Sequence, residues 1–135
     1  SRAMWNRLRA ELDEKGYGVY AVELKSSGSL IGLLGFHWAD FKADFTPCVE
    51  IGWRLVPEAW GHGYATEGAR ACLEHGFARL GLDRVYSFTA CVNLPSQAVM
   101  QRAGMRKTAE FNHPKVAPDS VLYPHVLYVR EASHA

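Results

Sequence analysis

A glycine-rich turn between a β-rich segment and a long amphipathic helix is the feature that most constrains this fold. Residues 60–65 read Trp-Gly-His-Gly-Tyr-Ala, and residues 48–56 before them alternate apolar side chains as a strand does. Residues 64–80 carry apolar side chains at helical spacing, and Gly81 is placed to end that helix. A further β-rich segment follows at 84–92, so the unit predicts a right-handed parallel strand–helix–strand crossover.

The other segments complete a mixed pattern of strands and helices. Residues 18–24 and 30–38 flank a Ser-Ser-Gly turn and predict an antiparallel hairpin. The remaining predicted elements are helices at 4–15 and 96–103 and strands at 105–111 and 125–131, with a proline-containing loop at 113–124. The order predicts an α+β (mixed α/β) fold with helices packed on one sheet.

Composition excludes several classes of protein. The 135 residues, 48% of them hydrophobic, predict a single domain over 1–135. A net charge of +1 gives no reason to expect a nucleic-acid or membrane partner. No apolar run approaches a membrane span, and residues 1–15 carry charges where a signal peptide has an apolar stretch. A cytoplasmic protein is the expectation.

The cysteines predict neither a disulfide framework nor a metal site. Their number is odd, no CxxC occurs, and Cys48, Cys72 and Cys91 each lie in an apolar run. We expect each to be a small buried hydrophobe in a reducing compartment.

The turn at 60–65 has the features of a phosphate-binding site. Gly61 and Gly63 allow a tight backbone, and the start of the following helix offers unpaired N–H groups and a positive dipole end. A plain strand-to-helix turn would also use these glycines, so both interpretations stay open on spacing alone. A Walker loop is excluded because no Gly-Lys-Ser/Thr follows, and a third glycine at dinucleotide spacing is missing.

The same turn resembles the acyl-CoA signature of the GNAT superfamily, (Gln/Arg)-x-x-Gly-x-(Gly/Ala), with Trp60, Gly63 and Ala65 at its defined positions. Trp60 departs from the usual Gln or Arg, although aromatic residues are common there in one branch. That branch, the ribosomal-protein N-terminal acetyltransferases, is also resembled by residues 50–77 and 93–105.

The resemblance covers about 18–130 and implies the GNAT fold, a mostly antiparallel mixed sheet with a central splayed parallel pair and flanking helices. Members of the family begin with another strand and helix, which this sequence lacks; the expectation is an N-terminally truncated domain.

The resemblance further implies acetyl-CoA as cosubstrate, with no metal. The strand before the turn would pair with the pantetheine arm, the turn amides would hold the pyrophosphate, and an Asn after the next strand would bind the cosubstrate. The residues assigned in this way are Leu55, Val56, Trp60, Gly61, His62, Gly63, Tyr64, Ala65 and Asn93.

Direct attack of an amine on the thioester needs a base, because an amine is mostly protonated at neutral pH. Glu50 is the first candidate by resemblance, and a solvent-facing carboxylate or salt-bridge partner is the structural alternative. His37, His113 and His125 are rival bases because histidine titrates near neutrality.

An acid near the departing sulfur would assist the same reaction. The resemblance points to Ser96, which could instead cap the helix at 96–103. Many family members use a tyrosine four residues later, where this chain has Met100.

The acceptor is less constrained by the sequence. Trp38, Phe41 and Phe45 could line an acceptor site or cover the core, and the loop at 113–123 could shape that site. The predicted function is N-acetylation of a primary amine, either a protein N-terminus or a small molecule, with a homodimer left open. The alternatives are a non-catalytic acyl-CoA-binding or sensor module and a dimeric scaffold that binds no cofactor.

Overall fold

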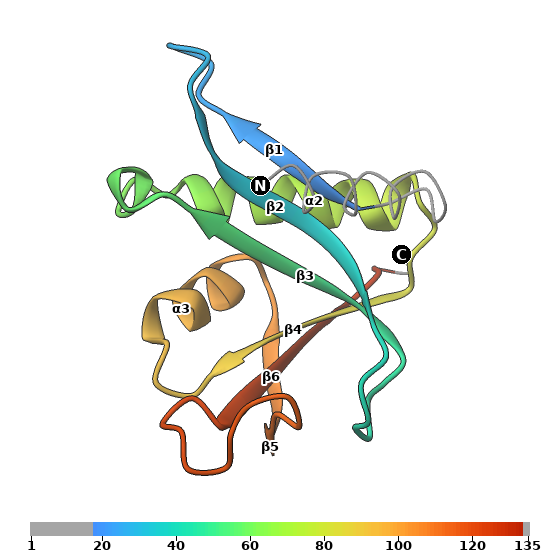
Figure 1. Ribbon diagram of the computed structural model, residues 1–135. Coiled ribbons are helices and arrows are strands. Elements are labelled where there is room, and N and C mark those ends of the chain that lie inside the picture. The colour runs from blue at the N-terminus through green and yellow to red at the C-terminus, as the bar shows by residue number, and fades with distance from the viewer. Residues whose placement is uncertain (1–17, 134–135) are drawn as a thin grey trace.

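A computed structural model of the chain describes residues 18–133, which form one six-stranded mixed sheet with helices packed on it (Figure 1). The elements are β1 (Val19–Glu23), β2 (Leu30–Ala39), β3 (Cys48–Leu55), the 3-10 turn η1 (Pro57–Ala59), α2 (Tyr64–Ala78), β4 (Arg84–Ala90), α3 (Leu94–Arg102), β5 (Arg106–Asn112) and β6 (Pro124–Glu131). The strand order β1-β2-β3-β4-β6-β5 confirms the predicted α+β architecture. The helix predicted at 4–15 lies outside the described residues.

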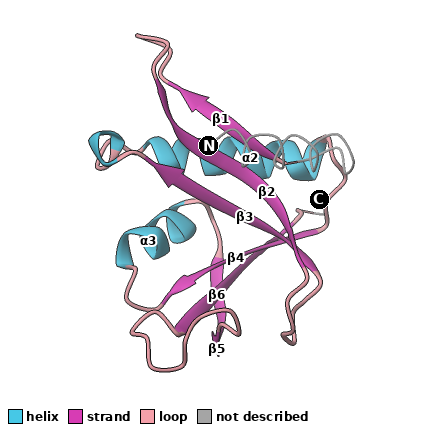
Figure 2. Cartoon of the chain, viewed as in Figure 1, coloured by secondary structure: helices cyan, strands magenta, loops and turns pink. Residues whose placement is uncertain are grey.

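Every neighbouring strand pair is antiparallel except β3 and β4, which confirms the predicted parallel crossover through α2. The β3–β4 pair is joined at a single register position, Glu50 opposite Tyr86, whereas β2 and β3 are paired along the whole of β3. The two strands diverge toward their carboxyl ends (Figure 2). This is the splayed parallel pair that the family resemblance implied.

Two helix boundaries differ from the sequence prediction. Helix α3 begins at Leu94 rather than at 96, because the Asn93 side chain accepts the Ser96 N–H at 3.2 Å and caps the helix there. Helix α2 ends at Ala78 rather than at 80, because the Leu82 N–H turns back to the Gly76 carbonyl while Gly81 adopts a left-handed φ of 70°.

Helix α2 packs closely on one face of the sheet because two of its glycines let β2 approach. A Cβ on Gly68 would lie 2.7 Å from Leu34, and one on Gly76 would lie 2.6 Å from Phe36. The core between these layers joins α2, α3 and the central strands. Its buried members are Leu34, Phe36, Ile51, Ala69, Cys72, Leu73, Val85, Met100, Ala103, Met105, Val126 and Tyr128.

The cysteines differ in burial, and this predicts their reactivity. Cys48 and Cys72 are buried as expected, whereas Cys91 is only half-buried. Burial raises the pKa of Cys72 to about 12; burial together with the Glu50 carboxylate raises that of Cys48 to about 11. The thiolate is the reactive form, so a raised pKa slows alkylation.

At pH 8 we therefore expect Cys91 to react with Ellman's reagent first, and Cys48 and Cys72 to react at least about 100-fold more slowly. All three should react in denaturant. A Cys91→Ser variant should lose the fast phase, and rapid native labelling of Cys72 would contradict its burial.

Candidate functional site

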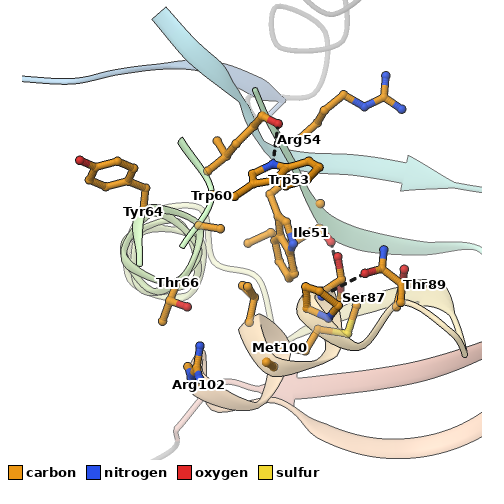
Figure 3. A pocket seen from close by; sticks show the side chains of 18 of the residues that line it. Ile51, Trp53, Arg54, Trp60, Tyr64, Thr66, Ser87, Thr89, Met100 and Arg102 are labelled. Atoms are coloured by element: carbon orange, nitrogen blue, oxygen red, sulfur yellow. Dashed lines mark hydrogen bonds between the residues drawn. The ribbon is translucent and has the colours of Figure 1, made fainter. Parts of the chain in front are cut away.

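A pocket of about 700 Å³ opens where β3 and β4 diverge. Its walls come from β3, the turn after it, the first turn of α2, the middle of β4 and the inner side of α3. Figure 3 shows Trp53 and Trp60 on one side of this pocket and Met100 and Arg102 on the other. The parallel crossover therefore brings the predicted turn, strand and short helix around one cavity.

Part of the β3 backbone in this wall is not hydrogen-bonded to β4, because β4 diverges from β3 there. The Val56 N–H donates to the Ile31 carbonyl at 2.8 Å, which fixes the alternation of the strand. Since successive residues direct their amides to opposite edges, Trp53 and Leu55 direct theirs away from β2, toward the pocket. Both residues line the pocket, and the Leu55 carbonyl accepts the Trp60 indole N–H at 2.9 Å.

Val56, which was predicted together with Leu55 to pair with the pantetheine arm, does not line the pocket. Its N–H is already hydrogen-bonded to β2. Trp53 was not among the predicted residues, although it lies two residues before Leu55 on the same side of the strand.

No side chain at Gly61 or Gly63 competes for the backbone N–H groups of the turn. Gly61 and Gly63 have left-handed φ angles of 79° and 78°, and a Cβ on either would meet no described atom within 4 Å. Gly63 is the N-cap of α2 and makes no side-chain cap, so no cap side chain occupies the first-turn amides. Tyr64 and Ala65 line the pocket at this helix start. A helix N-terminus of this kind is suited to an anion.

The two remaining turn residues lie at its outer side. Trp60 is 64% exposed, lines the pocket and ties the turn to β3 through its indole N–H. His62 is exposed, does not line the pocket, and stacks on Tyr64 with ring centroids 5.2 Å apart.

Both predicted catalytic residues line the same pocket. Glu50 comes from β3 and Ser96 from the first turn of α3, and each is half-buried. Asn93, predicted to bind the cosubstrate, lines the pocket and also caps α3, so the capping alternative for Ser96 is wrong. Met100, in the place of the family's tyrosine, is 1% exposed and packs in the core.

The three rival histidines do not line the pocket. His37 lies opposite Glu50 in the β2–β3 ladder. Burial, and then the neighbouring His125 and Lys115, lowers the pKa of His113 below its usual range. The Lys115 N–H donates to Nδ1 of His113 at 3.1 Å, which also favours the neutral ring.

Two arginines near the start of α2 were missed by the sequence analysis. Arg102, at the end of α3, lines the pocket and an adjoining hollow that Gly63, Thr66 and Arg70 also line. The Arg70 Nε donates to the Arg102 carbonyl at 2.7 Å, which joins the two helices there. Both arginines line this hollow, and so do Glu67 and Glu74; of the two arginines, Arg102 also lines the main pocket with the N-cap residue Gly63. Their sequence positions are far apart, so only the packing of α3 on α2 shows the pair.

Within residues 18–133, no cluster of three His, Cys, Asp or Glu side chains is arranged to hold a metal ion. In the same region, neither helix has both the length and the apolarity that crossing a membrane requires. The one buried polar side chain in this part of the chain, Ser87, donates to the Ile51 carbonyl at 2.8 Å across the diverging strands.

Comparison with known proteins identifies the family of this chain. The sequence model of the family described as "Acetyltransferase (GNAT) domain" matches residues 1–106. The uncharacterized N-acetyltransferase YnaD of Bacillus subtilis (strain 168) is 33% identical over 111 residues, covering 82% of this chain. The chain spans 61% of the length of YnaD, about three fifths of that curated relative.

Two solved structures are similar over nearly the whole chain. An acetyltransferase (GNAT family) from Bacillus anthracis superposes with a TM-score of 0.72 at 28% identity, covering 93% of this chain and 71% of that one. Mycobacterium smegmatis RimJ in complex with CoA-disulfide gives 0.78 at 25% identity, covering 97% and 60%. The chain belongs to the GNAT acetyltransferase domain family.

Proposed function

We propose that the protein is an N-acetyltransferase that transfers an acetyl group from acetyl-CoA to a primary amine by direct attack. The observation that carries the proposal is the pocket, which combines an unpaired β3 edge at Trp53 and Leu55 with an uncapped helix start at Gly63. A long ligand with an amide-containing arm and a pyrophosphate fits these two features together.

The residues present fit acetyl-CoA along its length. Free strand amides match the amide groups of pantetheine, as an added strand would. The turn from Gly61 to Ala65 supplies amides for the pyrophosphate, and Arg102 adds positive charge beside it. Asn93 borders the same cavity from the α3 side. Within this set we assign the strand role to Trp53 and Leu55 rather than to Val56.

Acyl transfer requires that one proton is removed from the attacking amine and that one is delivered to the departing sulfur. Acetyl-CoA supplies the thioester acyl group. Glu50 accepts a proton from the attacking amine as the C–N bond forms, directly or through water. A strand amide at Trp53 or Leu55 stabilises the negative charge on the carbonyl oxygen. Ser96 donates its hydroxyl proton to the sulfur as the C–S bond breaks and regains a proton from water, and the products are the amide and the CoA thiol.

A second function has one observation in its favour. Met100 replaces the usual acid and is packed in the core, so a module that binds acyl-CoA without transferring it remains the alternative. The two functions differ in whether amines cause release of CoA thiol.

The binding step is tested by thermal melts with acetyl-CoA, using ATP and NAD as controls. A ligand present at 100 times its Kd stabilises the folded state by about 2.7 kcal/mol. For a domain of this size we expect the Tm to rise by about 8 °C with acetyl-CoA. No rise at millimolar acetyl-CoA would overturn the cosubstrate assignment. A rise without thiol release over a panel of amines would favour the binding module.

A further inference from the structure

Seven half-buried rings gather beside the pocket and are not used by the proposed chemistry. They come from the loop between β2 and β3, from β4, and from the facing ends of β5 and β6. We call them the aromatic wall: Phe41, Phe45, Tyr86, Phe88, Phe111, His113 and His125. Contacting ring centroids lie from 4.5 Å, between Phe41 and His113, to 6.4 Å, between Phe88 and His125.

The aromatic wall shares a face of the sheet with Glu50. Residues directly paired between strands lie on the same face, and Glu50 is paired with Tyr86. Phe88 is two residues further along β4, so it lies on that face too. Helix α2 packs on the other face, against Leu34 and Phe36.

Strand pairing also places residues of β6 and β5 on this face of the sheet. Ala90, two residues beyond Phe88, is paired with His125, and His125 is paired with Phe111. All of these side chains therefore lie on the Glu50 face.

Phe88 joins the wall to the pocket. It lines the pocket beside Ser87, and its ring lies 5.4 Å from Phe41 and 5.8 Å from Phe111. Phe45 contacts Tyr86, the residue paired with Glu50, with ring centroids 5.6 Å apart. A molecule resting on these rings would have its near end at the pocket.

The charge distribution suits an ammonium group attached to a ring. Glu50 is the carboxylate at the near edge of the wall. The loop that carries Phe41 and Phe45 exposes Asp40 and Asp44 together with Lys42, so it adds a net negative charge of one. Burial lowers the pKa of His113, and its Nδ1 accepts the Lys115 backbone N–H, so both effects favour the uncharged ring, which does not repel a cation. Aromatic faces attract both other rings and cations.

We propose that the acceptor is a small primary amine whose nitrogen lies a few bonds from an aromatic ring, with the ring packed on the aromatic wall and the nitrogen at Glu50. This inference rests on the proposed function and names the substrate class of that site. The wall contributes rings from four segments of the chain, and Glu50 is the carboxylate at its near edge, so it favours an arylalkylamine with one ammonium group over a polyamine with several.

The test compares four amines at saturating acetyl-CoA, with thiol release as readout and each rate referred to the unprotonated fraction of its amine: 2-phenylethylamine, 2-cyclohexylethylamine, n-butylamine and spermidine. We expect kcat/KM for 2-phenylethylamine to exceed that for n-butylamine at least about tenfold, with 2-cyclohexylethylamine between them. Phe45→Ala should reduce this ratio at least about threefold, and Phe45→Leu should reduce it less. Leu30→Ala, an exposed apolar truncation on the distant hairpin, should leave the ratio unchanged.

Equal kcat/KM for 2-phenylethylamine and n-butylamine, a preference for spermidine, or an unchanged ratio in Phe45→Ala would overturn the inference. Phe111→Leu is the second variant should Phe45→Ala fail to fold, and its expected effect is the same reduction. The two proposals fail differently. If acetyl-CoA raises the Tm and amines release thiol without aromatic preference, only the acceptor class is wrong. If no amine releases thiol, the proposed transfer fails and this inference with it.

Discussion

Replacing Glu50 with Gln is expected to lower kcat for amine acetylation by about 10²–10⁴-fold, the range typical of losing a general base. The amide keeps the shape of the side chain at the β3 wall but cannot take the proton from the attacking nitrogen. The acetyl-CoA Kd should stay within about twofold, because the strand edge and the turn are untouched. Steady-state thiol release gives kcat, and calorimetry gives the Kd.

Glu58→Gln is the matched control, since Glu58 is exposed in η1 and does not line the pocket. It should leave kcat unchanged. The loss in Glu50→Gln should shrink as pH rises toward the amine's own pKa, because more of the acceptor then arrives unprotonated. A kcat within about threefold of the parent enzyme at pH 7 would remove Glu50 from the base role.

Replacing Gly63 with Val is expected to raise the KM for acetyl-CoA about tenfold or more. The φ of 78° at this N-cap is unfavourable for a β-branched residue by about 1–2 kcal/mol, and no clash adds to that cost. The backbone should relax by moving the first turn of α2, and with it the amides at Tyr64 and Ala65. The measurement is the acetyl-CoA dependence of initial rate, together with the Tm without ligand.

The same helix provides a matched control at its other end. Gly81 has a φ of 70°, also with no described atom within 4 Å of an added Cβ, and it lies beyond the end of α2 away from the pocket. Gly81→Val should lower the Tm by a similar amount and leave the KM unchanged. If both variants raised the KM equally, the effect would be one of global stability and the turn would lose its assigned role.

Local sequence patterns were sufficient to predict the strands and helices and to recognise the glycine-rich turn. Strand alternation and helical spacing depend on neighbouring residues, so β2, β3 and α2 were predicted close to their observed bounds, and so was the crossover they imply. The turn was recognisable because left-handed backbone favours glycine, and both Gly61 and Gly63 have that conformation. The resemblance then placed Glu50 and Ser96, which do line one pocket.

Competition for hydrogen bonds was only partly visible in the sequence. Val56 was predicted together with Leu55 to face the cosubstrate, yet its N–H is bonded to Ile31, and the free amides belong to Leu55 and Trp53. Asn93 caps α3 where Ser96 was the candidate. The Val56 bond depends on how the fold places Ile31, whereas the Asn93 cap spans only three residues and Asn is a favoured N-cap, so sequence spacing could have found it.

The remaining features of the site depend on contacts between residues that are far apart in the sequence. Arg70 and Arg102 meet through the contact of α2 with α3, and the aromatic wall assembles rings from Phe41 to His125 across four segments. From the sequence, Phe41 and Phe45 could either cover the core or line an acceptor site, because an apolar loop residue is compatible with both positions. The pairing of Glu50 with Tyr86 places these rings on the same face of the sheet as Glu50, and a strand register of that kind exists only in the folded sheet.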